Sequence, residues 1–260
     1  MDIKKYELVV DTKITMDGHD LYRIKAIKNV FNSKGELVVS AGEIGGYIEK
    51  EENLSHEHGA WISGDAKVFG EAKVRGDAKV FGEAMIKDNA EIFQNAQVYG
   101  YALVYNYAQV YGDAEVYDFA KVSGCAQIFD GAKCFGHAKI CDGADIYGQA
   151  KIYDEARVRD SASIFGNAEI HGDAKIYGSA NVCDNGNVFD NAEIHGNASV
   201  RRNAIVYGHA EIYADAVITD SAKIYGYAEV YGNARIGGTT EINGHGEIYR
   251  TVEINCGYYA

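Results

Sequence analysis

Four basic residues recur at intervals of 18 positions in the middle of the chain and are the first candidates for binding chemistry. They are Lys121, Lys139, Arg157 and Lys175. If residues 18 apart are neighbours in space, these like charges repel one another and the repulsion must be offset. Acidic neighbours such as Glu155 could balance them, another subunit could cover them, or an anion could bind them. The phosphates of coenzyme A or of a nucleotide are the sharpest ligand hypothesis.

His137 is the best candidate for a catalytic base, because the same interval places Glu155 beside it. A histidine titrates near neutral pH, and a neighbouring carboxylate can orient its ring and stabilise its protonated form. His209 and His245 share the interval and are weaker candidates. The sequence shows no nucleophile motif, glycine-rich phosphate loop or metal-ligand spacing beyond what chance would give. We therefore expect no metal site.

The longest series with this interval is aromatic. Its members are Phe81, Tyr99, Tyr117, Phe135, Tyr153, His171, Phe189, Tyr207 and Tyr225. Stacked rings stabilise adjacent strands, and a long apolar stripe usually marks a contact surface. We interpret the Phe and Tyr members as an interface for self-association, with a small-ligand groove as the alternative. A second series, Phe93, Tyr111, Phe129, Tyr147 and Phe165, favours stacking because rings then decorate more than one face.

These series rest on a shorter repeat that dominates the chain. From Ile62 to Ile254, every sixth residue is Val or Ile, with Cys134 as the exception. Two positions before each stands a small residue, which is Ala from Ala66 to Ala234 except at Gly186. Residues two apart share one face of a strand, so the small and branched residues point inward together. A period of six does not keep one face of a helix, which excludes a helical solenoid.

Six residues supply one short strand and one corner, where Gly, Asp or Asn tolerates a positive φ. Three such units close a triangular coil of 18 residues, and stacked coils pair each strand with its equivalents in the coils on either side. The sequence therefore predicts an all-β fold, a parallel β-helix whose core is filled by the Ala and Val columns.

The run from Gly64 to Val74, GDAKVFGEAKV, resembles the hexapeptide-repeat, left-handed parallel β-helix superfamily. The left hand is implied by that resemblance. The segment from Gly45 to Ser55, GGYIEKEENLS, followed by Ala60-Trp61-Ile62, is similar to uncharacterised hexapeptide-repeat proteins of bacteria and prophages, some labelled as acetyltransferases. The superfamily includes many trimeric acyltransferases, in which a corner histidine between subunits deprotonates the acceptor. The resemblance therefore implies that role for His137, with coenzyme A in an intersubunit groove.

The beginning of the chain does not repeat. Residues 1–36 read as a small β cap, with strands over Tyr6–Val10 and Leu21–Ile27 and a turn at residues 17–20. We expect an irregular first coil over residues 37–60 and the repeat solenoid over 61–260. The cap would cover the open end of the ladder, which otherwise invites pairing between molecules. We expect Trp61, the single tryptophan, to pack between the cap and the first coil.

Composition narrows the class of protein. The 260 residues carry a formal charge of −13 and include 30 Gly, no Pro and 5 Cys. The excess of acid disfavours direct binding of nucleic acid. No apolar run is long enough for a membrane span, and the first residues do not resemble a signal peptide. We therefore expect a cytoplasmic protein with reduced thiols and no zinc.

The function that we expect is that of a non-catalytic binding or scaffold protein, a homodimer or homotrimer that self-associates through its aromatic edge and has room for a protein partner. It needs no cofactor. A coenzyme A-dependent acyltransferase with an intersubunit site is the alternative. The third hypothesis follows from the prophage resemblance: an anti-defence protein that mimics nucleic acid or sequesters a nucleotide. The uniform repeat favours the scaffold, because it specifies a rigid surface rather than a pocket.

Overall fold

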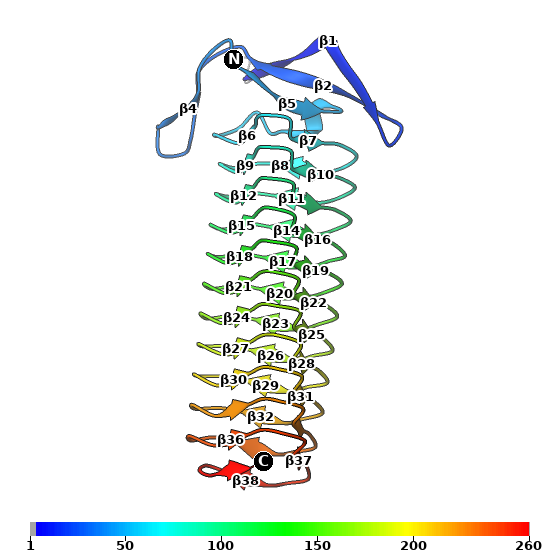
Figure 1. The fold of residues 1–260 in the computed structure, drawn as a ribbon. Coiled ribbons are helices and arrows are strands. Elements are labelled where there is room, and N and C mark those ends of the chain that lie inside the picture. The colour runs from blue at the N-terminus through cyan, green and yellow to red at the C-terminus, as the bar shows by residue number, and fades with distance from the viewer. Residues whose placement is uncertain (1–3, 260) are drawn as a thin grey trace. The chain divides into compact units, whose positions relative to one another are not determined.

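A computed structural model of the protein describes residues 4–259 and consists almost entirely of β-strands (Figure 1). It divides into two compact units, Met1–Asp130 and Gly131–Ala260. In both units, strands of two residues recur every six residues, and each pairs in parallel with a strand 18 residues away. Each unit is therefore a parallel β-solenoid with three strands to a coil, which confirms the predicted architecture. No helix among residues 4–259 is long and apolar enough to cross a membrane.

The first unit contributes strands to three sheets. The first sheet contains β7 (Lys67–Val68), β10 (Met85–Ile86), β13 (Leu103–Val104) and β16 (Lys121–Val122). The second contains β8 (Lys73–Val74), β11 (Glu91–Ile92), β14 (Gln109–Val110) and β17 (Gln127–Ile128). The third contains β6 (Trp61–Ile62), β9 (Lys79–Val80), β12 (Gln97–Val98) and β15 (Glu115–Val116).

The second unit repeats the same three-sheet pattern. Its first sheet contains β19 (Lys139–Ile140), β22 (Arg157–Val158), β25 (Lys175–Ile176), β28 (Glu193–Ile194), β31 (Glu211–Ile212), β34 (Glu229–Val230) and β37 (Glu247–Ile248). Its second contains β20 (Asp145–Ile146), β23 (Ser163–Ile164), β26 (Asn181–Val182), β29 (Ser199–Val200), β32 (Val217–Ile218), β35 (Arg235–Ile236) and β38 (Glu253–Ile254). Its third contains β18 (Lys133–Cys134), β21 (Lys151–Ile152), β24 (Glu169–Ile170), β27 (Asn187–Val188), β30 (Ile205–Val206), β33 (Lys223–Ile224), β36 (Glu241–Ile242) and β39 (Tyr258–Tyr259).

The core consists of the Ala and Val or Ile columns, as the repeat predicts. In β14, for example, Ala108 and Val110 are fully buried, whereas Gln109 between them faces outward and is half-buried. Cys134 takes the place of a branched residue and is also fully buried, which raises the pKa of its thiol. All five cysteines are free. Burial of small and branched side chains from Ala60 to Ile242 supplies the hydrophobic stabilisation of both units, whereas Ile248 and Ile254 at the end of the second unit are only half-buried.

Each corner has a residue with positive φ, and aspartate serves there as well as glycine. Asp154 and Asp160 have φ angles of 55° and 61°. Their carboxylates accept the backbone N–H of the residue 18 positions later, at 3.2 Å for Gly172 and 2.9 Å for Gly178. Because the corner backbone donates to the neighbouring coil, a residue without an N–H would interrupt the ladder. This accounts for a repeat without proline.

The N-terminal cap is an antiparallel hairpin, as predicted, with longer strands than expected. Strand β1 (Tyr6–Met16) pairs with β2 (His19–Ala26). Strand β5 (Ile44–Ile48) pairs antiparallel with β2 and parallel with β7, so it joins the hairpin to the solenoid (Figure 1). A short pair, β3 (Val30–Phe31) and β4 (Leu37–Val39), and one helical turn, η1 (Glu51–Asn53), complete the cap.

Buried polar and aromatic side chains attach the cap to the first coil. The Lys5 ammonium is 2% exposed and donates to the carbonyls of His58 and Ala60, at 3.1 and 2.8 Å. Trp61 is buried, and the ring of Tyr6 contacts it edge-on with centroids 6.4 Å apart. Trp61 therefore packs where the sequence predicts. A buried cation is stable here because carbonyl oxygens take the place of its hydration water.

Candidate functional site

The predicted aromatic series forms stacked ladders on the third sheet of each unit. In the first unit, Phe81 stacks on Tyr99 at 4.7 Å and Tyr99 stacks on Tyr117 at 4.8 Å. In the second unit, the stacked rings are Phe135, Tyr153, His171, Phe189, Tyr207 and Tyr225, with centroids 4.8–5.0 Å apart. All of these side chains are half-buried, so only their outer edges reach solvent.

Several stacked tyrosines donate a hydrogen bond to the residue 16 positions later. The Tyr99 hydroxyl donates to Glu115 at 3.0 Å, and the hydroxyl of Tyr177, which follows β25 on the first sheet of the second unit, donates to Glu193 at 3.2 Å. Burial, the adjacent Glu193 charge and this hydrogen bond raise the pKa of Tyr177 to about 12. A tyrosine that directly follows one strand therefore reaches, with its hydroxyl, the first residue of the equivalent strand in the next coil. The stacking and hydrogen bonds of these rings therefore stabilise the ladder itself, whether or not a partner binds.

A third ladder was not predicted. It lies on the first sheet of the second unit and consists of Tyr177, His195, Tyr213, Tyr231 and Tyr249, with centroids 4.7–5.5 Å apart. Its members obey the same 18-residue interval and the same position after the core residue, so the signal was present in the sequence. The predicted second series also stacks, at 4.8 Å for Phe93 on Tyr111 and 4.8 Å for Tyr147 on Phe165 on the second sheet, so all three sheets carry stacked rings.

One corner carries a second set of stacked rings that are exposed. Tyr101 and Phe119 are 54% and 47% exposed, and they stack at 5.1 Å with nearly parallel planes. In the second unit, Tyr227 is stacked between His209 and His245 at 4.8 and 5.0 Å. Tyr101, Phe119, His209 and Tyr227 each lie two positions after a member of the half-buried ladder. The corner thus presents the apolar surface that a partner can cover.

The basic residues are distributed over both units. Lys121 lies on β16 of the first unit, whereas Lys139, Arg157 and Lys175 occupy successive strands β19, β22 and β25 of the second. Lys139 and Arg157 are exposed, and Lys175 pairs with Glu193 at 2.6 Å. A shallow groove beside them is lined by Arg157, Lys175, Glu193, Asp173, Asn191 and His209. Charges of both signs therefore meet in this groove.

The structure places His137 and Glu155 at the same corner of successive coils in the second unit, and both are exposed. The backbone N–H of His137 donates to the carbonyl of Asp154 at 2.8 Å, which holds the corner in register. The adjacency that the interval predicts is therefore present at the level of the backbone. Acyl transfer by these side chains, and anion binding by the basic column, stay predictions. Among residues 4–259, no group of three His, Cys, Asp or Glu side chains could hold a metal ion.

Asp77 fastens the cap loop to the first coil. Its carboxylate accepts the backbone N–H of Ser33 at 3.1 Å and that of Gly59 at 2.9 Å, and it also accepts the Ser33 hydroxyl. Partial burial opposes ionisation, but these hydrogen bonds outweigh it and hold the pKa of Asp77 below its ordinary value of 3.8. The ionised carboxylate therefore contributes stability that depends on pH.

We expect the stability advantage of the wild type over Asp77→Asn to be complete above pH 3.8 and to vanish as the pH falls through the lower folded pKa. The folded state binds fewer protons than the unfolded state in that window, so acid removes the contribution. Urea unfolding followed by the fluorescence of Trp61 would measure both proteins at each pH. A difference that stays constant or grows on acidification would contradict this prediction.

No protein-family model matches the chain, and no curated protein is significantly similar to it. The function is therefore inferred from the geometry of the aromatic ladders, the basic residues and the corner at His137.

Proposed function

We propose that the protein is a non-catalytic scaffold of the hexapeptide-repeat β-helix type, which self-associates through an aromatic edge. In the first unit this edge consists of Phe81, Tyr99 and Tyr117 on the third sheet and Tyr101 and Phe119 at the adjoining corner. The exposed, stacked pair Tyr101–Phe119 is the observation that supports the proposal most directly. In the second unit, Phe135, Tyr153, Phe189, Tyr207 and Tyr225 belong to the same proposal.

The spacing of the rings along the edge favours a second copy of this chain as the binding partner. The rings stand 4.7–5.1 Å apart, which is the distance between adjacent strands of a sheet. Another solenoid with the same repeat presents its side chains at the same spacing, so two edges related by a two-fold axis can match over several coils. The formal charge of −13 on each chain opposes this contact, and added salt should therefore strengthen it.

The test is the oligomeric state of Tyr101→Ser/Phe119→Ser, measured by light scattering over a range of concentrations. We expect an oligomeric wild type and a double variant whose dissociation constant is about a hundredfold higher, because central aromatic residues supply most of the energy of a contact. These side chains are exposed, so the variant should keep its fold, which circular dichroism and thermal melting would verify.

Tyr107→Ser is the matched control, because Tyr107 is 63% exposed but lies at another corner of the first unit. It should leave the association unchanged. A wild type that is monomeric at all concentrations would overturn the proposal, as would a double variant that associates as strongly as the wild type. Equal weakening by Tyr107→Ser would show that the contact is not confined to the edge.

A coenzyme A-dependent acyltransferase remains the alternative. The observation in its favour is the arrangement in the second unit, where exposed His137 and Glu155 occupy one corner and Lys139 and Arg157 follow on paired strands. In this alternative, His137 would remove a proton from the acceptor while the basic side chains bind the cofactor phosphates. Coenzyme A is then the only cofactor implied.

A further inference from the structure

The aromatic ladder on the third sheet of the first unit stops one coil short of the cap. Phe81 and Tyr99 follow strands β9 and β12, and Ser63 takes the equivalent place after β6. The backbone is equivalent at the two positions. The backbone N–H of Ser63 donates to the carbonyl of Val80 at 2.9 Å, and the backbone N–H of Phe81 donates to the carbonyl of Val98 at 3.0 Å. One face of the Phe81 ring stacks on Tyr99, and among residues 4–259 no ring stacks on its other face. The ladder thus has a vacant place above Phe81.

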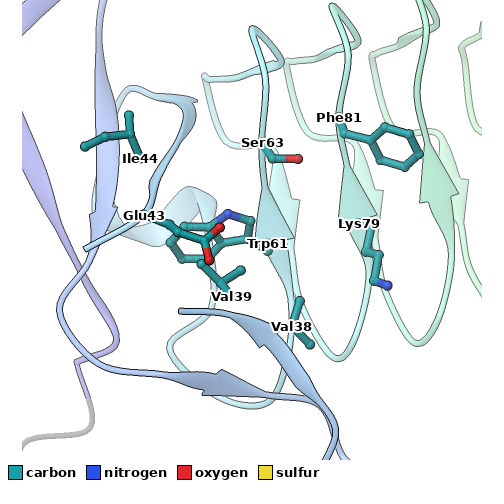
Figure 2. Close-up of a pocket in the computed structure, with 8 residues that line it drawn as sticks. All are labelled: Val38, Val39, Glu43, Ile44, Trp61, Ser63, Lys79 and Phe81. Carbon is teal, nitrogen blue, oxygen red and sulfur yellow. The ribbon is translucent and has the colours of Figure 1, made fainter. Parts of the chain in front are cut away.

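A cavity lies at this vacancy. Its volume is about 220 Å³, and its lining residues come from the cap and from the first two strands of the third sheet: Val38, Val39, Glu43, Ile44, Trp61, Ser63, Lys79 and Phe81. Figure 2 shows Ser63 and Phe81 on neighbouring strands, with Trp61 behind Glu43 and Lys79 on the same strand as Phe81. An apolar cavity of about 150 Å³ can hold a benzene molecule, so this one has room for a single substituted ring.

The repeat indicates which polar group such a ring would meet. In the ladders, the far end of several tyrosine rings contacts the residue 16 positions later, as Tyr99 contacts Glu115 and Tyr111 contacts Gln127, both at 3.0 Å. For a ring that occupies the place beside Ser63, the corresponding residue is Lys79. An ammonium group therefore stands at the far end of this place, as Lys151 and Lys223 do 16 positions after Phe135 and Tyr207, whereas Tyr99 and Tyr111 meet a carboxylate and an amide.

The cavity lining carries one charge of each sign, and Lys79 is the group placed to pair with an anionic substituent. Within residues 4–259, Lys79 forms no ion pair, and it is exposed at the side of the cavity. Glu43 also lines the cavity, but its carboxylate accepts the backbone N–H of Ser40 at 2.8 Å, which holds it to the cap loop. A ligand carboxylate at Lys79 would gain a charge-assisted hydrogen bond.

We propose that this cavity binds a planar aromatic acid, with its ring stacked on Phe81 in the place that the ladder leaves vacant and its carboxylate at Lys79. Stacking supplies the preference for a flat ring, since the neighbouring rings lie 4.7 Å apart and nearly parallel. The aliphatic side chains of Val39 and Ile44 shield the ring on the side of the cap. The cavity shares Phe81 with the aromatic edge, but the exposed pair Tyr101 and Phe119 does not line it.

The protein carries its own reporter for this site, because Trp61 is its single tryptophan and lines the cavity. Benzoate titrated into the wild type should change the tryptophan fluorescence in a saturable way. Benzamide, which has the ring without the charge, should bind about fivefold more weakly, since a partly exposed ion pair contributes at that level. Cyclohexanecarboxylate, which has the charge without a planar ring, should also bind more weakly.

Ser63→Tyr is the decisive variant, because it supplies the missing ring from the chain itself. It should abolish benzoate binding while leaving the melting temperature unchanged or higher, since the added ring continues a ladder that the fold already accepts. Lys79→Gln should weaken benzoate about fivefold and leave benzamide unaffected. Lys73→Gln, on β8 of the second sheet and outside the cavity, is the matched control and should bind as the wild type does.

Several results would overturn the proposal. They are a wild type whose fluorescence does not saturate with benzoate at millimolar concentration, a folded Ser63→Tyr variant that still binds, and equal affinity for cyclohexanecarboxylate and benzoate. If Ser63→Tyr does not fold, the comparison of Lys79→Gln with Lys73→Gln decides, and equal binding by those two variants would also overturn it.

Discussion

Val110→Asp is expected to unfold the first unit. Val110 is fully buried and pairs in register with Ile92 of the preceding coil and Ile128 of the next. No group of opposite charge is buried in this column, so the new carboxylate must remain unpaired or become protonated. The cost exceeds about 4 kcal/mol, which is most of the stability of an ordinary domain. Because each coil contacts only its neighbours, the loss of one coil also removes the support of the coils beside it.

The matched control changes the adjacent residue of the same strand. Gln109 faces outward, and its neighbour on the preceding coil, Glu91, is already paired with Arg75. Gln109→Asp should therefore cost less than about 1 kcal/mol. Circular dichroism and urea unfolding would compare the two variants. A folded Val110→Asp protein of nearly wild-type stability would contradict the assignment of the Val column to the core.

Gly46→Ala is expected to detach the cap from the solenoid. A Cβ at Gly46 would lie 2.6 Å from the carbonyl oxygen of Ala66 and 2.6 Å from Cγ2 of Ile62. That carbonyl already accepts the N–H of Tyr47 at 2.8 Å, so the clash opposes the pairing of β5 with β7. Backbone cannot yield as a flexible side chain can, and the expected cost is about 3 kcal/mol.

Gly246→Ala serves as the control for that substitution. A Cβ at Gly246 would meet Asn243 and Ile242 at 3.5 and 3.6 Å, which is ordinary contact. The change should alter stability by less than about 0.5 kcal/mol. Trp61 fluorescence and hydrogen exchange in β1 and β2 would report whether the cap is attached. Equal protection of the hairpin in Gly46→Ala and the wild type would show that the close approach is not needed.

The sequence by itself determined the solenoid, its core and the composition of the predicted ladders. Residues two apart share a face of a strand, and residues 18 apart share a column, so Val110 had to point inward and Phe81 had to stack on Tyr99. The ladder from Tyr177 to Tyr249 was readable by the same rule. Such inferences succeed because every coil has the same local surroundings, and a local pattern then specifies a global arrangement.

Only the tertiary structure decided how much of each column is accessible. The repeat separates inward from outward positions, but it does not distinguish the half-buried ring of Tyr99 from the exposed ring of Tyr101 two residues later. That difference arises because a side chain on a face is flanked by its neighbours, whereas one at a corner projects away from them. Likewise, the pairing of Lys175 with Glu193 depends on side-chain geometry within the column.

The cap lies beyond the reach of the repeat altogether. Its contacts join segments that are distant in sequence and share no period. Examples are the close approach of Gly46 to Ala66, the hydrogen bond between Asp77 and Ser33, and the lining of the cavity beside Ser63. A serine in an aromatic column looks like an ordinary variation until Val38, Val39, Glu43 and Ile44 of the cap are found to line the cavity beside it (Figure 2). The physical reason is that a translational repeat encodes its own interior, whereas the contacts that end the repeat are set by packing between unlike elements.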